Sequence, residues 1–167
     1  MGRPNSQEEM IERGDKGAGA WLGLAARMAI GLVFVVSGTF KAAAPAEEFA
    51  LVIDYYRLIG SQDLILVLST FLPWIEVVVG FALIFGFVTR AAAIAAGGMF
   101  LAFIIAVIST KARGIELPNC GCFGFGWHPS ATQTLIMDSL LSLASIQVFR
   151  QGERIWSLDN WCSSGYN

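Results

Sequence analysis

The sequence predicts an all-α integral membrane protein, a four-transmembrane-helix antiparallel bundle with a short interfacial helix between spans one and two. The composition is the first reason, because 55% of the 167 residues are hydrophobic and 14% are charged, whereas soluble domains carry about 25% charged residues. The second reason is distribution, since the charges concentrate in tails and loops and long apolar runs fill the rest. Four of these runs have about the 20 residues that a spanning helix needs.

The chain is expected to form one membrane domain, residues 18–150, between polar cytoplasmic tails at 1–17 and 151–167. The first 17 residues are mixed in charge and do not resemble the short basic start of a cleaved signal peptide, so the first apolar run should remain as a span. The net charge of −2, without a basic block, gives no reason to expect a nucleic-acid partner.

Span one is expected at about 18–40, with Arg27 as its only charge and Lys41 at its far end. Small residues along it would let another helix approach closely in lipid. Residues 45–58 then begin with a proline and two acidic residues, as a helix N-terminus does. Their paired tyrosines suit a membrane boundary, so we expect a short helix lying on the bilayer.

Span two is expected at about 64–88 and contains Pro73 and Glu76. The turn at Thr89 and Arg90 is so short that span three, at about 91–110, must be its antiparallel neighbour. A loop at 111–130 leads to span four, at about 131–149, which contains Asp138. Six Lys and Arg residues lie in the tails and the Arg90 turn and four in the other two loops, which favours cytoplasmic termini and a periplasmic 111–130 loop.

That loop contains Cys120 and Cys122, separated by Gly121. A disulfide between residues i and i+2 needs a bent backbone, and glycine allows it. Such a bond would be strained, and strained exposed disulfides are labile, so one interpretation is a redox-active dithiol. The alternatives are a glycine-rich turn whose cysteines act as small hydrophobes or half of a Cu(I) site. No ligand cluster surrounds the pair, so we expect no metal.

Two further residues bear on the cysteine loop. His128 lies six residues past Cys122, where it would lower a thiol pKa or act as a base, or would simply be solvated. Cys162 falls on the opposite side of the membrane in this topology and would not pair with the loop cysteines. The sequence assigns it no role.

Three ionisable residues fall inside predicted spans, where each costs about 2.5–3.5 kcal/mol. Helical rise places Arg27 about 10–14 Å and Glu76 about 12 Å from the inner face, so the two are level, which predicts an ion pair. The pair would fix helix register, or Glu76 would receive protons or face a quinone headgroup. Asp138 would lie about 10 Å below the outer face, within reach of Lys41 or the cysteine loop, and is the better candidate for proton exchange.

Three stretches resemble the DoxX-like superfamily, and within it the methylamine-utilisation protein MauE branch: SGTFKAAAPAEEF after span one, LPWIEVVVGFALIFG in span two and CGCFG before span four. The likeness covers about residues 22–150. It implies four spans, with Cys120 and Cys122 matching the cysteine motif, Glu76 the acidic residue after LPW, and Lys41 the basic residue that closes span one. Proteins similar to MauE are thought to assist disulfide formation in periplasmic methylamine dehydrogenase, and other relatives are subunits of a thiosulfate:quinone oxidoreductase.

The sequence and the resemblance together predict a multi-pass protein of the bacterial inner membrane with thiol–disulfide redox activity. It would pass electrons between a periplasmic thioredoxin-like or other redox protein and the quinone pool, or assist maturation of a periplasmic redox enzyme. A quinone is the expected cofactor, bound without a covalent bond. The alternative is a non-catalytic accessory subunit that packs in the lipid against a larger respiratory or photosynthetic membrane complex.

Overall fold

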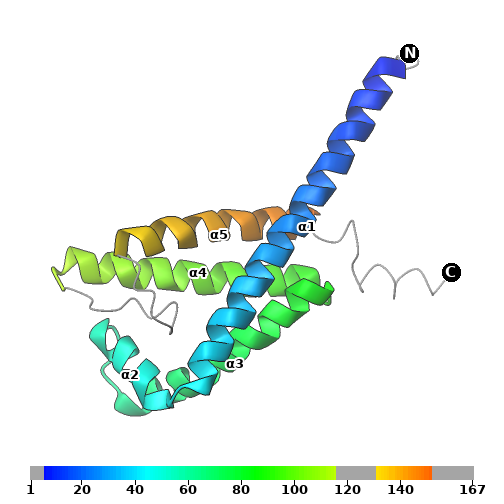
Figure 1. Cartoon of the computed structure of the whole chain (residues 1–167). Coiled ribbons are helices and arrows are strands. Elements are labelled where there is room, and N and C mark those ends of the chain that lie inside the picture. Colours follow the sequence, from blue (N-terminus) through cyan, green and yellow to red (C-terminus); the bar gives the residue numbers. More distant parts are fainter. Residues whose placement is uncertain (1–5, 116–130, 152–167) are drawn as a thin grey trace.

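The chain folds into five helices in a computed structural model that describes residues 6–115 and 131–151 (Figure 1). They are α1 (Ser6–Ala43), α2 (Ala46–Tyr55), α3 (Gln62–Phe85), α4 (Thr89–Ala112) and α5 (Ala131–Gln151). The described residues contain no strand, and the prediction of an all-α protein is confirmed. Helix α1 begins at Ser6, so it continues into the polar stretch before the first apolar run, and this N-terminal part extends away from the other helices (Figure 1).

Burial in this protein is inverted relative to a water-soluble domain. Large apolar side chains face outward, with Val78 65%, Leu143 64% and Trp74 59% exposed, whereas charged side chains such as Arg27 and Glu76 are buried. Extensive apolar surface of this kind marks contact with a membrane or a partner. Three helical segments are long and apolar enough to cross a bilayer, namely Trp21–Ala43, Gln62–Phe85 and Thr89–Ala112. The chain is therefore a membrane protein.

Glycines bring α1 and α3 into backbone contact. A Cβ atom added at Gly80 would lie 2.8 Å from the carbonyl oxygen of Gly31, and one added at Gly38 would lie 2.7 Å from the carbonyl oxygen of Pro73. Because the contacts advance along α3 as they go back along α1, the two helices run in opposite directions. Lipid tails are as apolar as the helix surfaces, so no hydrophobic driving force brings helices together in a bilayer. Small residues instead let the helix backbones approach closely enough to pack.

The same contacts fix the register of the two helices. Gly38, near the end of α1, is level with Pro73 in the middle of α3, so the first one to two turns of α3 extend beyond the end of α1. Helix α2 packs on α3 and lies at this end of the molecule (Figure 1). It begins at Ala46 and ends at Tyr55, inside the predicted range 45–58.

Arg113 ties the end of α4 to the connection between α2 and α3. Its guanidinium donates hydrogen bonds to the carbonyl oxygens of Tyr56 and, at 3.0 Å, Arg57. Arg57 has φ of +47°, a left-handed conformation that is uncommon for a non-glycine residue. The planar fork of arginine suits two adjacent acceptors, so this side chain holds the turn against α4.

A tight turn makes α3 and α4 sequential neighbours. Gly86 ends α3 with φ of +67°, and the backbone N–H of Phe87 reaches back to the carbonyl oxygen of Ala82 at 2.9 Å, which is the glycine-terminated helix end that satisfies the last carbonyls.

Helix α5 packs against α4 and α1. Helices α1 and α4 are also in contact, since Phe34 meets Phe100 edge to face with ring centroids 5.0 Å apart.

Replacing Gly80 with alanine should destabilise the protein by about 1–3 kcal/mol, because the new methyl group would press on the backbone of α1. Gly98→Ala is the matched control, since no atom lies within 4 Å of its added Cβ. Thermal unfolding in one detergent compares the two variants. Equal melting temperatures for Gly80→Ala and Gly98→Ala would contradict the close packing of α1 on α3.

Candidate functional site

A buried ion pair joins α1 to α3. The ammonium nitrogen of Lys41 lies 2.8 Å from Oε1 and 3.0 Å from Oε2 of Glu76, and the Ser37 hydroxyl donates to Oε2 at 3.5 Å. The two charged side chains are 5% and 4% exposed. Ser37 and Lys41 are four residues apart and so share one face of α1. Gly38, three residues before Lys41, leaves room for the carbonyl oxygen of Pro73 and the Cβ atom of Glu76 to approach α1.

Two aromatic rings complete the surroundings of the Lys41 ammonium. Its nitrogen lies 5.0 Å from the ring centroid of Phe49 in α2 and 5.2 Å from that of Phe103 in α4. Both distances are within the range of a cation–π interaction, which gains strength when the cation is desolvated. Four helices therefore meet at one buried charge.

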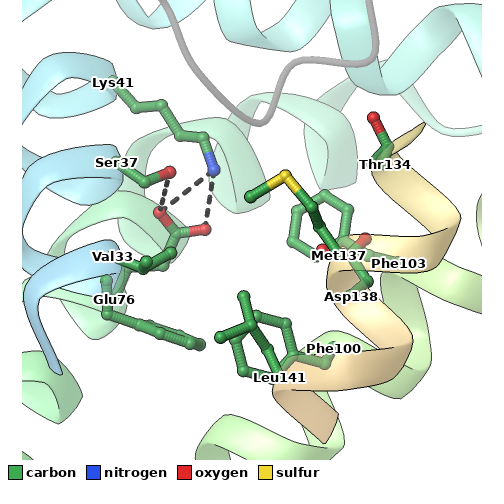
Figure 2. Close-up of a pocket in the computed structure, with 11 residues that line it drawn as sticks. Val33, Ser37, Lys41, Glu76, Phe100, Phe103, Thr134, Met137, Asp138 and Leu141 are labelled. Atoms are coloured by element: carbon green, nitrogen blue, oxygen red, sulfur yellow. Dashed lines mark hydrogen bonds and ion pairs between the residues drawn. The ribbon is translucent and has the colours of Figure 1, made fainter. Parts of the chain in front are cut away.

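The ion pair forms one wall of a cavity of about 50 Å³. Figure 2 shows Ser37, Lys41 and Glu76 on one side and Thr134, Met137 and Asp138 of α5 on the other. Aromatic and aliphatic side chains form the remaining wall, including Phe34, Phe100, Phe103 and Leu141. A water molecule needs roughly 10–15 Å³ of such space, so the cavity has room for several.

The α5 wall contributes buried polar atoms without a partner among the described residues. Thr134 is 3% and Asp138 7% exposed, and within residues 6–115 and 131–151 neither Oγ1 of Thr134 nor Oδ2 of Asp138 has a hydrogen-bond partner. Buried polar groups are nearly always paired with protein or water. Both residues line the cavity, so a water or ligand there would satisfy them.

The predicted pair between Arg27 and Glu76 is wrong. Glu76 is level with Gly38, and eleven residues of helix, about 16 Å, separate Gly38 from Arg27. The contact of Gly31 with Ile84 shows that Arg27, one turn earlier in α1, is level with the end of α3. The depth estimate failed because it took the ends of the first two spans as flush, whereas α3 begins well beyond the end of α1.

Of the other candidate residues, the structure brings Lys41, Glu76 and Asp138 to one cavity. Cys120, Cys122, His128 and Cys162 lie outside the described residues. Ser37 and Thr134 were not singled out from the sequence. Each lies four residues before a charged residue of the cavity, so the shared helix face was the available signal. Within the described residues no group of three His, Cys, Asp or Glu side chains is placed to hold a metal ion.

An all-helical fold with outward apolar faces and a small polar cavity between its helices defines an integral membrane protein with a buried ionisable site. The family model described as methylamine utilisation protein MauE matches residues 19–149, and the chain belongs to that family. The match includes all three charged residues of the cavity and the two loop cysteines. No curated protein and no solved structure matches the chain.

Removing one member of the ion pair should destabilise the protein more than removing both. Lys41→Met or Glu76→Leu alone leaves a buried charge without its partner, which costs about 3–5 kcal/mol, whereas replacing both with apolar residues is often neutral. Chemical unfolding of the two single variants and the double variant gives the coupling free energy.

The matched control combines Arg27→Met with Glu76→Leu. Residues more than about 7–10 Å apart with no shared partner have additive effects, so this double variant should show no coupling. Coupling between Arg27 and Glu76 that equalled the coupling between Lys41 and Glu76 would contradict the observed pairing.

Proposed function

We propose that this protein is a thiol–disulfide redox protein of the bacterial inner membrane. Cys120 and Cys122 form the redox pair, and electrons pass between a periplasmic thiol protein and the quinone pool, in catalysis or in maturation of a periplasmic redox enzyme. The observation that supports this most is the cavity of Lys41, Glu76 and Asp138, because ionisable groups inside membrane helices mark functional paths. Glu76 and Asp138 would carry protons, and His128 would support the thiols.

Helix α5 is the fourth span in this proposal. It has 21 residues, about 31 Å of helix, and its exposed apolar residues fall on an outward face at Ile136, Leu140 and Leu143, while Asp138 is buried. Four spans place both termini on one side, which the distribution of Lys and Arg favours as the cytoplasm. The segment between α4 and α5 then lies on the periplasmic side, where disulfides persist.

The position of the cavity in the chain supports a link to the cysteines. Thr134 and Asp138 are in the first two turns of α5, which begins at Ala131, and α4 ends at Ala112. The cysteine segment connects these two helix ends. The ammonium of Lys111 donates a hydrogen bond of 3.4 Å to the Thr132 hydroxyl, so the end of α4 and the start of α5 lie side by side, about 10 Å from Asp138 along α5.

Electrons and protons balance in two steps. In the direction that oxidises the partner, two partner thiols reduce the Cys120–Cys122 disulfide through a mixed disulfide, and the partner gains a disulfide. The thiols of Cys120 and Cys122 then pass two electrons and two protons to a quinone. The quinone becomes a quinol, and the Cys120–Cys122 disulfide forms again. Asp138 and Glu76 would relay the two protons between the thiols and the quinone oxygens.

The accessory-subunit alternative also has a specific observation in its favour. A shallow cavity of about 220 Å³ lies between α4 and α5, lined by Ala93, Gly97 and Phe149 among others, and Gly98 beside it faces open space. A glycine on an outward helix face next to a shallow cavity suits docking of another membrane helix. In this alternative the protein would co-purify with a larger complex in fixed ratio, and the cysteines would be passive.

The redox proposal predicts that Cys120 and Cys122 cycle between thiol and disulfide in the membrane. Membranes are alkylated with a heavy thiol reagent before and after reduction, and the peptide that carries both cysteines is weighed. The expected result is a gain of two reagent masses only after reduction, reversed when the reductant is removed in air. Single variants Cys120→Ser and Cys122→Ser are the controls, and each should show one reagent mass without reduction.

Two outcomes would contradict the redox proposal. One is a pair of thiols that stays reduced in aerated membranes. The other is a double variant, Cys120→Ser with Cys122→Ser, that leaves partner oxidation unchanged while the protein stays assembled with a larger complex. The second outcome would also establish the accessory-subunit alternative.

A further inference from the structure

A second cavity, of about 260 Å³, lies between α2, α3 and α4. Its wall is almost entirely apolar and is formed by residues of all three helices, including Ile53, Leu68, Leu72, Met99, Ala102 and Ala106. A dry apolar cavity of about 150 Å³ already holds a benzene-sized molecule, so this cavity has room for part of a hydrocarbon chain. We call it the apolar groove.

The apolar groove follows one face of α4 and is open to the outside of the protein. Met99, Ala102 and Ala106 are spaced three and four residues apart and therefore share a helix face. They span about 10 Å of helix, which fits within one leaflet, half of a hydrocarbon core of about 30 Å. Ala102 is exposed, and Leu58, also of the groove wall, is 50% exposed. In a bilayer the groove is thus open to lipid chains.

Arg113 stands at one end of this groove. It comes seven residues, or two helical turns, after Ala106, and its backbone N–H still bonds to the carbonyl oxygen of Ser109 at 3.2 Å, so it continues the same face of α4. Its guanidinium donates to the carbonyl oxygen of Tyr56, whose side chain lines the groove. Because Arg113 directly follows the candidate span Thr89–Ala112, it lies at the level expected for lipid head groups.

The charge at this end of the groove is positive and accessible. The Arg113 guanidinium has five N–H donors and bonds to three carbonyl oxygens, those of Ser109, Arg57 and Tyr56, which leaves donors for a further ligand and does not neutralise the charge. Arg57 adds a second exposed guanidinium on the turn that Arg113 contacts. Within the described residues neither arginine forms an ion pair with a carboxylate. Arginine binds phosphate through two parallel N–H bonds.

We propose that the apolar groove and the two arginines bind one anionic phospholipid, with its phosphate between Arg57 and Arg113 and one acyl chain in the groove. Such a lipid has both required parts in the required order, a charged phosphate at the end of the span and a hydrocarbon chain directed toward the middle of the bilayer. The lipid fills the space between α2, α3 and α4. The site involves neither the Lys41–Glu76 pair nor the cysteines, so its test is separate from the redox test.

The test uses the complete protein in dodecyl maltoside, a neutral detergent, so that no membrane charge contributes. A phosphatidylglycerol with a diazirine midway along one acyl chain labels the protein, and the label should lie on the α4 peptide that contains residues 99–106. Competition by unlabelled lipid gives apparent Kd values. Phosphatidylglycerol should compete about tenfold or more better than phosphatidylcholine, because each basic residue near an anionic head group contributes several-fold.

Two variants test the head-group contacts. Arg57→Gln should reduce the preference for phosphatidylglycerol over phosphatidylcholine about fivefold, the value for one basic residue, and Arg113→Gln should reduce it at least as much. Arg113 also holds the turn between α2 and α3, so Arg57→Gln gives the answer if Arg113→Gln is unstable. The matched control is Arg150→Gln, which removes an exposed arginine from the opposite end of α5 and should leave the preference unchanged.

Groove variants test the chain end. Ala102→Phe and Ala106→Phe fill the groove and should each remove most of the label from the α4 peptide, whereas Leu101→Phe, on the outward face of α4, should not. Two groove positions are used so that one unstable variant leaves the other informative.

Three results would overturn the site. Equal competition by phosphatidylglycerol and phosphatidylcholine would show that the arginines do not read the head group. Label spread over the outward faces of the helices, and unchanged in the groove variants, would show a non-specific lipid coat. An α4 peptide that stays unlabelled at saturating lipid would show that another part of the protein or a second copy fills the groove.

Discussion

The buried ion pair between Lys41 and Glu76 is the constraint on which the rest of the structure depends. Taking two charges out of water costs several kcal/mol each even after relaxation, so the pair persists only where its remaining hydrogen-bonding capacity is met. Here the Ser37 hydroxyl donates a hydrogen bond to Glu76, and the rings of Phe49 and Phe103 contact the Lys41 ammonium. These groups come from α1, α2 and α4, and together with Glu76 of α3 they fix the positions of four helices around one ammonium.

The glycines of α1 and α3 make the pair possible. Gly38 lies about one turn from Lys41, and its missing side chain lets the carbonyl oxygen of Pro73 and the Cβ atom of Glu76 approach α1. The resulting register leaves the first one to two turns of α3 beyond the end of α1, and α2 packs on α3. An apolar groove between α2, α3 and α4 is a consequence of that arrangement. The Lys41–Glu76 ion pair, the register of α1 against α3 and the apolar groove therefore depend on one another.

The unmatched carboxylate gives the cavity its chemical character. Ion pairing accounts for Lys41 and Glu76 as structural groups, but it does not account for Asp138, whose buried Oδ2 has no hydrogen-bond partner in the part of the chain that the structure describes. A group that costs stability in this way and lies in a cavity is a candidate for function rather than packing. Its place in α5, two turns from the end of the cysteine segment, connects the described site to the proposed thiol chemistry.

The sequence predicted the helices well because apolar length and turn residues are local signals. The structure places α3 at Gln62–Phe85 and α4 at Thr89–Ala112, within three residues of the predicted ends. Charge pairing was not local, and the Arg27–Glu76 prediction failed because register depends on where each helix begins relative to its neighbour. Spacing within one helix could have identified two further residues of the cavity. Ser37 shares a helix face with Lys41, and Thr134 shares one with Asp138.

If the cysteine pair exchanges electrons with a quinone, as we propose, the number of electrons transferred can be measured directly. Protein with reduced Cys120 and Cys122 is mixed with a quinone in nanodiscs without oxygen, and quinol is measured by absorbance while the disulfide is measured by mass. We expect one quinol for each disulfide formed, and none from the Cys120→Ser/Cys122→Ser protein. Reduced cysteines that remain accessible to alkylation and yet form no quinol would contradict it.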